Sequence, residues 1–366
     1  MALLGQKLRL LAGLLAGDRA LGGPFLVLVD LTGRCNLRCP GCRYHSPHLD
    51  ASAVGADLSL PLFERLCQQL AALGTRRLIL TGEGEPLLHP EWPRLLETAR
   101  RRGLHTTLYT NATLLDETAA TTMLAHGPDT LIVSLWAASA ETYRQAYPGD
   151  PDRFAAIVNN VRELSRRRAG HGGRPRIRLY HPINRSNHRD LAGLVDLART
   201  MGCDEIHFSP FRTRRGRLQA LALDAEETRA VCETLRSLQA PLQAQGLAHN
   251  LDTTLRRFTD GASGWAGIPC YAGWVQAHVK SDGAVHACKS CAVAMGNLRD
   301  QDFAGIWNGP NFRRFRHDML SAEGMQAWQA DLDCEFCGQL PENQRIHRVY
   351  RWFAPVRSVV HSKARG

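Results

Sequence analysis

Residues 25–42 read FLVLVDLTGRCNLRCPGC, an apolar, strand-like run followed at once by three cysteines. We call these cysteines the first cysteine set: Cys35, Cys39 and Cys42. Three thiolates within eight residues, on a loop at the end of a strand, can ligate three irons of a four-iron cubane and leave the fourth iron open to a ligand. The alternative is a closed zinc site, which needs a fourth ligand such as His45 or His48.

The first 210 residues alternate between short strands and longer helices. Runs rich in β-branched or aromatic residues predict six strands: Phe25–Leu31, Arg77–Thr81, His105–Asn111, Thr130–Trp136, Arg176–His181 and Glu205–Pro210. Apolar residues between them repeat at helical spacing, as at Leu62, Leu66 and Leu70. The sequence therefore predicts an α/β fold of parallel βαβ units, either an open, partial (β/α)6 TIM-like barrel or a doubly wound sheet.

The CxxxCxxC spacing resembles the signature of the radical S-adenosylmethionine (SAM) superfamily, and the resemblance extends over about residues 25–210. It implies a radical SAM barrel in which the open iron of a [4Fe-4S] cluster chelates the amine and carboxylate of SAM. Reduction would then cleave SAM to methionine and a 5′-deoxyadenosyl radical, which abstracts a hydrogen atom. The family usually has an aromatic residue just before the third cysteine, where this chain has Gly41. Tyr44 is the candidate for the missing adenine contact.

Polar residues at the ends of later strands also match the family. The segment 81–86, TGEGEP, follows the second strand and resembles the GGEP motif, whose backbone and glutamate contact the SAM amino group. Positions in the third to fifth units match groups that hold the SAM carboxylate or ribose. The resulting SAM-binding candidates are Gly84, Glu85, Asn111, Ser134, Arg178 and Asn187. Taken individually, such residues serve equally well as caps or turns.

A second group of cysteines lies near the C-terminus. We call it the second cysteine set: Cys270, Cys288, Cys334 and Cys337. The dipeptide Asp282-Gly283 predicts a hairpin that carries one of these ligands. The region resembles the extension called SPASM in its longer form and Twitch in its shorter form. Its spacing resembles that of the Twitch enzyme that dehydrogenates an aminocyclitol alcohol.

The count of five cysteines in this region, against seven or more in a full SPASM extension, implies one auxiliary [4Fe-4S] cluster with four cysteine ligands. By themselves, the four thiolates would favour a structural zinc. The fifth cysteine, Cys291, is a spare thiol, a replacement ligand or a hydrogen-atom donor. Three further cysteines fall in apolar patterns and are predicted to be buried structural thiols: Cys67, Cys203 and Cys232.

Composition limits the compartment and the partners. Eleven cysteines without an export signal favour metal ligation in a reducing cytoplasm. The apolar run Leu8–Ala16 is too short to span a membrane and predicts an N-terminal helix. The net charge of +10 permits a nucleic-acid partner, but the basic runs lack interleaved aromatics, so we favour a solvated surface. The predicted divisions are residues 1–23 (helix), 24–210 (radical SAM core), 211–262 (helical connection), 263–340 (auxiliary module) and 341–366 (basic tail).

The sequence favours a radical SAM oxidoreductase that acts on a small polar metabolite, such as a sugar or aminocyclitol. In that hypothesis the auxiliary cluster accepts an electron, and a flavodoxin- or ferredoxin-type protein reduces the SAM-binding cluster. The alternative enzyme is a peptide maturase or epimerase, and the short segment of about 24 residues before the first strand argues against it. A metal-stabilised nucleic-acid-binding protein is the alternative from another class. The sequence assigns no catalytic base.

Overall fold

We describe a computed structural model of the chain over residues 2–49, 55–147, 153–213, 218–260, 268–334 and 337–353. Within these ranges, ten strands form one sheet in the order β10-β9-β8-β1-β2-β3-β4-β5-β6-β7. The strands are β1 (Leu26–Asp30), β2 (Arg77–Thr81), β3 (His105–Thr110), β4 (Thr130–Ser134), β5 (Arg176–Ile183), β6 (Glu205–Pro210), β7 (Ala248–His249), β8 (Gln276–Val279), β9 (Ala284–His286) and β10 (Ala294–Asn297). The α-helices are α1 (Ala2–Ala16), α2 (Leu60–Ala72), α3 (Trp92–Arg101), α4 (Glu117–His126), α5 (Ala140–Ala146), α6 (Arg153–Arg168), α7 (Leu191–Thr200), α8 (Ala225–Ser237), α9 (Gln239–Ala244), α10 (Leu251–Asp260), α11 (Ala272–Val275), α12 (Phe303–Trp307), α13 (Pro310–Asp318), α14 (Ala322–Ala327) and α15 (Leu340–Tyr350).

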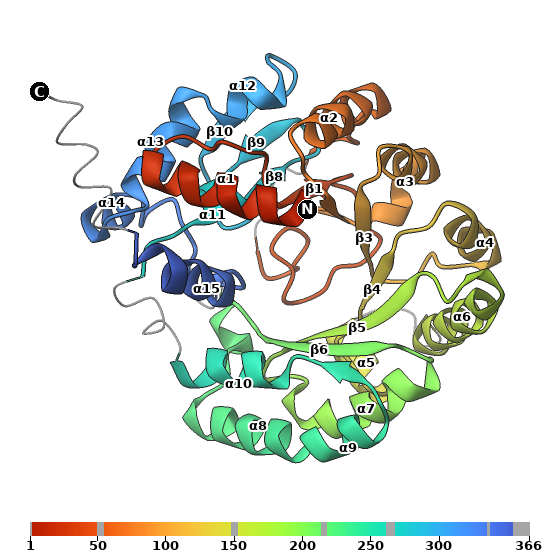
Figure 1. Cartoon of the computed structure of the whole chain (residues 1–366). Coiled ribbons are helices and arrows are strands. Elements are labelled where there is room, and N and C mark those ends of the chain that lie inside the picture. Colours follow the sequence, from red (N-terminus) through yellow and green to blue (C-terminus); the bar gives the residue numbers. More distant parts are fainter. Residues whose placement is uncertain are drawn as a thin grey trace, which may run out of the picture.

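Strands β1 to β6 form a curved wall with helices on its outer side (Figure 1). Each strand pairs in parallel with the next one along the chain. A doubly wound sheet reverses its strand order at a switch point, and this order has no reversal between β1 and β6. The structure therefore confirms the partial (β/α)6 barrel. All six predicted strands are present, and β2 and β6 have the predicted bounds.

The two faces of the strands have different roles. Successive side chains of a strand point to opposite faces. In β1, Val27 and Val29 are fully buried in the hydrophobic core, whereas Leu28 lines the cavity inside the barrel. The interior face of the later strands is more polar, with Tyr109 on β3 and Tyr180 on β5. The apolar faces hold the barrel together, and the interior face is left for function.

Helix α2 illustrates why the segments between the strands are helical. Pro61 lies in its first turn, where the backbone needs no amide hydrogen. The buried residues follow helical spacing: Leu60, Leu62, Phe63, Leu66, Cys67 and Leu70. Gly74 follows the helix at a φ of 85°, a left-handed conformation that glycine adopts without strain. Local sequence thus determines both the length of the helix and the face that it buries.

The C-terminal region joins the barrel sheet. Strand β8 pairs in parallel with β1, and β9 and β10 continue the sheet in antiparallel order. The predicted hairpin at Asp282-Gly283 connects β8 to β9, with Gly283 at a φ of 88°. At the other edge, β7 extends the sheet within the segment 211–262, which we had expected to be a helical connection only. The auxiliary region therefore shares one sheet with the radical SAM core.

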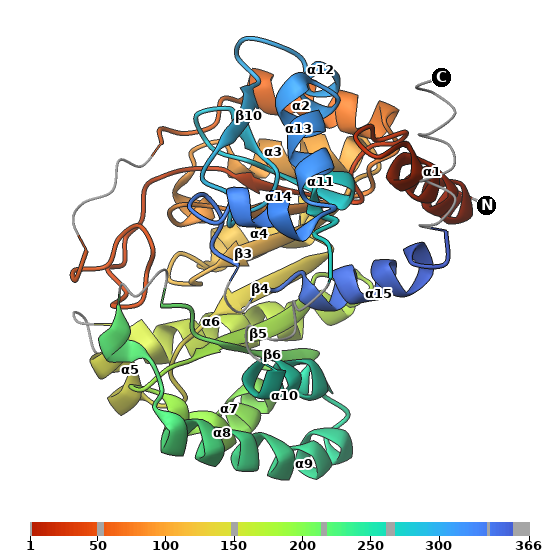
Figure 2. The ribbon, with the colours of Figure 1, turned by 90° about the vertical axis from the view of Figure 1, so that its left-hand side faces the viewer.

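The two ends of the barrel carry different elements. Figure 2 shows the loop after β1 at one end and helix α1 at the other. The predicted N-terminal helix is present as α1, and its buried residue Leu14 packs against the body of the protein. Across the described ranges, no helix is long and apolar enough to cross a membrane.

Candidate active site

A cavity of about 410 Å³ opens at the C-terminal ends of the barrel strands. Its wall includes the whole first cysteine set, the turn after β2 and the ends of β3 to β6. Lys289, which follows Cys288 of the second cysteine set, also lines it. The Arg43 side chain, next to Cys42, donates a hydrogen bond of 3.1 Å to the Lys289 carbonyl. The cavity therefore lies at the contact between the two cysteine-bearing regions.

The first cysteine set has the surroundings of a cluster-binding loop. Burial raises the pKa of Cys35 to about 11 and that of Cys39 well above its usual value, and the neighbouring cysteine thiolates raise both further. Backbone amides point at the sulfurs: Leu37 donates to Cys35 Sγ at 3.5 Å, and His45 donates to Cys42 Sγ at 3.3 Å. Crowded, half-buried thiols with amide donors need a cationic centre to become thiolates. These residues therefore fit a three-cysteine iron-sulfur cluster.

The turn after β2 packs directly on the loop of the first cysteine set. The Gly84 amide donates to the Thr32 carbonyl at 3.0 Å, and the Glu85 amide donates to the Arg34 carbonyl at 2.7 Å. A Cβ at Gly84 would lie 1.8 Å from the Arg34 carbonyl oxygen. Only glycine permits this approach, so Gly84 fixes the distance between the turn and the loop.

Glu85 lies at the cavity wall, but its carboxylate is occupied. Oε1 accepts from the Thr110 hydroxyl at 2.7 Å and the Leu87 amide at 3.1 Å, and Oε2 accepts from the Asn111 amide at 2.7 Å. Burial raises the pKa of Glu85, and these three donors oppose that effect. The side chain clamps the β2 turn to the end of β3. A contact between Glu85 and the SAM amino group stays a prediction.

The other predicted SAM-binding residues divide into two groups. Asn111 and Ser134 line the cavity, and their contact with SAM stays a prediction. Arg178 and Asn187 are not among the residues that line it. Arg178 Nε donates to Glu205 at 2.6 Å, and Asn187 donates to the carbonyls of Trp136 and Pro182. The structure thus gives Arg178 and Asn187 stabilising contacts within the fold.

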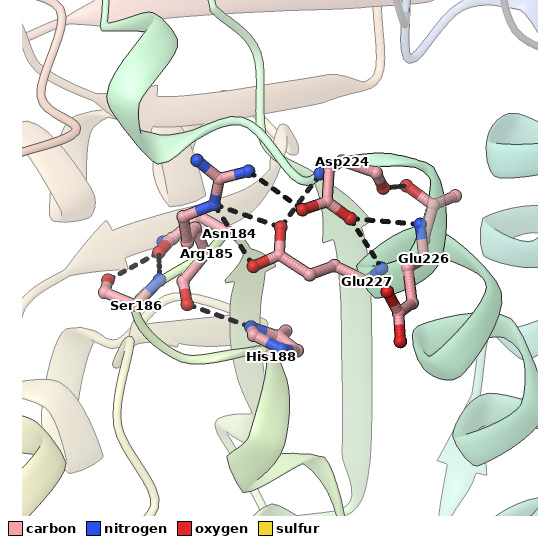
Figure 3. A network of polar contacts seen from close by, with 8 residues as sticks. Asn184, Arg185, Ser186, His188, Asp224, Glu226 and Glu227 are labelled. Atoms are coloured by element: carbon pink, nitrogen blue, oxygen red, sulfur yellow. Dashed lines mark hydrogen bonds and ion pairs between the residues drawn. The ribbon is translucent and has the colours of Figure 1, made fainter.

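The loop that precedes Asn187 is also held in place structurally. Arg185 reaches across to the N-terminus of α8, where its Nε donates to both oxygens of Glu227 at 3.0 and 3.1 Å (Figure 3). Asp224 and Glu227 form a capping box there. Asn184 accepts from the Ser186 amide in the same turn. These contacts favour the interpretation of this loop as a turn that braces β5 against α8.

Two aromatic side chains that the sequence did not point to occupy the space beside Gly41. A Cβ on Gly41 would come within 2.5 Å of Trp136 and 2.6 Å of Phe211. The two rings form an edge-to-face pair at 6.2 Å, and both line the cavity. Tyr44, the predicted substitute for the missing aromatic residue, also lines it. Gly41 was the one sequence signal for these two rings, because a glycine in place of the usual aromatic residue leaves room for other side chains.

The second cysteine set is gathered in one region, where Cys270 and Cys288 are buried and Cys334 and Cys337 are partly buried. Burial raises the pKa of each thiol, to about 12 for Cys270 and about 11 for Cys334, and neighbouring thiolates raise these two further. Arg212 opposes the shift at Cys334 and Cys337. Cys291 is 4% exposed, and its thiol donates to the Val293 carbonyl at 3.5 Å. Four neighbouring thiols, two buried and two partly buried, beside a cation fit an iron-sulfur cluster with full cysteine ligation.

Two ion pairs, one buried and one partly exposed, connect the core to the auxiliary region. Asp30, at the end of β1, accepts a 2.7 Å contact from Nε2 of His278 on β8, and both side chains are almost fully buried. Lys280 Nζ lies 2.8 Å from Glu83 Oε1, at the cavity wall. No group of three or more His, Cys, Asp or Glu side chains within the described ranges is arranged to hold a single metal ion.

Two family models match the chain. The radical SAM superfamily matches residues 29–174, and the iron-sulfur cluster-binding domain SPASM matches residues 270–338. The chain therefore carries a radical SAM domain and a SPASM domain. AdoMet-dependent heme synthase from Methanosarcina barkeri is 27% identical to it over 315 residues, covering 80% of this chain and 85% of the relative. PqqA peptide cyclase from Xanthomonas campestris pv. campestris is 27% identical over 305 residues, covering 80% and 76%.

Solved structures share the fold of this radical SAM enzyme. SuiB from Streptococcus suis, bound to its precursor peptide SuiA, has a TM-score of 0.63 at 17% identity, covering 85% of this chain and 71% of SuiB. The enzyme anSMEcpe with bound AdoMet has a TM-score of 0.64 at 15% identity, covering 93% and 100%. Both likenesses are at the level of the fold.

The comparisons confirm the predicted cofactors. The radical SAM domain binds SAM and a [4Fe-4S] cluster. The SPASM domain is an iron-sulfur cluster-binding domain, which favours an auxiliary cluster over the structural zinc considered from the sequence. The specific similarity to the aminocyclitol dehydrogenase is not supported, because the relatives found are a heme synthase and peptide cyclases. The oxidoreductase subtype is likewise not specifically confirmed. The assignment of each cysteine to one cluster stays a prediction.

Proposed function

We propose that this radical SAM enzyme modifies a peptide, by removing a hydrogen atom from one residue that enters the cavity. The observation that carries the proposal is the extended similarity to PqqA peptide cyclases, which covers 80% of this chain. The shared fold with SuiB, which was solved with a precursor peptide, supports it. A peptide substrate therefore replaces the small polar metabolite that the sequence favoured.

The form of the cavity agrees with a peptide side chain as the reacting group. At about 410 Å³ it lies at the lower end of the range for ligand sites. SAM has to occupy part of this space, next to the first cysteine set. A single side chain that enters from the surface, with the rest of the peptide outside, needs less room than an enclosed metabolite.

We assign a separate role to each group of residues around the cavity. The first cysteine set would hold the SAM-binding cluster, which together with SAM supplies the radical. Trp136 and Phe211 would cover the SAM adenine from the space beside Gly41, and Glu85 keeps the ends of β2 and β3 in register. The second cysteine set would hold an auxiliary cluster that accepts an electron. The flavodoxin- or ferredoxin-type donor remains part of this proposal.

The test is to express the enzyme with each short open reading frame of its gene neighbourhood and to analyse the peptides by tandem mass spectrometry. We expect one peptide to lose two mass units at a defined residue. A variant with alanine in the first cysteine set should leave that peptide unchanged. In deuterium oxide, a product of unchanged mass apart from one carbon-bound deuterium would indicate an epimerase.

The competing outcome is a small-molecule substrate. The heme synthase relative covers as much of the chain as the cyclases do. If every peptide stays unmodified while the reconstituted enzyme consumes SAM in the presence of a metabolite extract, the peptide proposal is wrong.

A further inference from the structure

Arg212 lies between the cavity and the second cysteine set. It follows β6, whose last residue is Pro210, and its side chain lines the cavity. Its Nη2 donates to the Ser290 hydroxyl at 3.0 Å and to the Asp333 backbone carbonyl. The Asp333 carboxylate lies 3.8 Å from the same nitrogen. One side chain of the barrel thus contacts two segments of the SPASM domain.

Both contacted segments carry cluster ligands. Ser290 stands between Cys288 and Cys291, and Asp333 directly precedes Cys334. Both hydrogen bonds come from the same nitrogen, Nη2, so this one group holds the two segments next to each other. Its Nε is buried without a hydrogen-bond partner among the described residues. A buried cationic group without full hydrogen bonding is favoured where negative charge lies near it.

The auxiliary site has such negative charge when the cluster is bound. A cluster held by four thiolates carries net negative charge, and its reduction adds one more. Cys270 and Cys288 are buried, and Cys337 is partly buried. Buried charge requires a compensating partner. Arg212 and Arg257 of α10 both act on Cys337 through their charge.

We propose that Arg212 is a positioning residue of the auxiliary cluster, which anchors two ligand segments against the cavity and raises the reduction potential of the cluster. Arg257 adds positive charge from the neighbouring helix. Cluster potentials depend on net charge and on surrounding hydrogen bonds, so both arginines make the cluster a better electron acceptor. The proposal depends on the auxiliary cluster and is independent of the substrate.

The test is an EPR-monitored redox titration of the anaerobically reconstituted holoenzyme without substrate. Added SAM perturbs the signal of the SAM-binding cluster, so the unperturbed signal reports the auxiliary cluster. We expect R212Q to lower the auxiliary midpoint potential by at least 59 mV, which corresponds to a tenfold weaker reduction in a one-electron couple. R257Q should lower it in the same direction by less, and R212K, which keeps the charge, should retain more of the potential than R212Q.

The matched control is R256Q, which removes the same charge from an exposed position next to Arg257 on α10. It should leave the potential unchanged. A fully iron-loaded R212Q with the potential of R256Q would overturn the proposal. If R212Q fails to load the auxiliary cluster, the midpoint potential of R257Q is compared with that of R256Q instead. Equal potentials in these two variants would overturn the role of arginine charge. A failed peptide assay would leave all these potentials as they are.

Discussion

The packing of Trp136 against Gly41 can be tested by a double-mutant cycle. The φ of Gly41 is not positive, so the backbone tolerates alanine there. The new Cβ, however, would lie 2.5 and 2.8 Å from two Trp136 ring atoms and 2.6 Å from Phe211. Carbon atoms prefer separations of about 3.5–4.0 Å, so both rings have to move by an ångström or more.

Moving the rings disrupts other contacts. The Trp136 indole donates to the Ser134 hydroxyl at 3.3 Å and pairs edge-to-face with Phe211. Overpacking of one methyl group typically costs about 1–3 kcal/mol, and we expect G41A to lower the free energy of unfolding by that amount. W136A leaves space into which Phe211 can move. In the W136A background, G41A should therefore cost less than about 0.5 kcal/mol, which gives a coupling energy of at least about 0.5 kcal/mol.

The assay is urea unfolding of the four proteins, with and without W136A and G41A, under anaerobic conditions. Gly170 offers a matched control, because a Cβ there meets nothing within 4 Å. G170A should shift the midpoint little in either background. Equal costs of G41A with and without Trp136 would refute the argument that these two residues fill one space.

Three further predictions follow from the site. W136A should weaken SAM binding by about 1–3 kcal/mol, the typical loss when an aromatic partner of a base is truncated, as measured by calorimetry with G170A as the control. Alanine in all three positions of the first cysteine set should abolish formation of 5′-deoxyadenosine and halve the iron from about eight to about four per chain; retained SAM cleavage would place its activation elsewhere. Burial raises the pKa of Asp30, but the charge and hydrogen bond of His278 lower this pKa below its ordinary value overall. The ionised Asp30 therefore stabilises the folded protein at neutral pH, and this stabilisation is lost as the pH falls through the lowered pKa. H278A should remove about 3–5 kcal/mol at pH 7, because it leaves a buried charge unpaired; unfolding free energies that do not differ from those of the native chain at pH 7 would contradict this.

The sequence predicted the barrel because its strands carry their signal locally. The segment Arg77–Thr81 is a short apolar run between two amphipathic helices, and its bounds were correct. The strand β8 has no such signal, since it reads QAHV and contains two polar residues. All four of its residues are buried, and the side chain of His278 contacts Asp30 of the neighbouring strand β1. That partner is 248 residues away, beyond the reach of any local pattern.

The site shows the same limit. The spacing of the cysteines pointed to both sets, because cysteine is a distinctive residue type, and their assignment as cluster ligands stays a prediction. Arg178 and Asn187 were assigned by their position in the fifth unit, and the structure places them outside the cavity wall. Arg212 was missed because its proposed role depends on contacts with Ser290 and Asp333, which are 78 and 121 residues further along the chain.

The relative position of the two cluster sites follows from the sheet. Strand β1 leads into the first cysteine set, and the β8–β9 hairpin leads to Cys288. These strands are adjacent and in fixed register, with Leu28 opposite His278. Arg43 then connects the two loops directly through the Lys289 carbonyl. The separation of the two cysteine sets therefore depends on strand pairing, on the Asp30–His278 contact and on Arg212, which joins the end of β6 to Ser290 and Asp333. A rigid separation is what electron transfer between a substrate in the cavity and the auxiliary cluster requires.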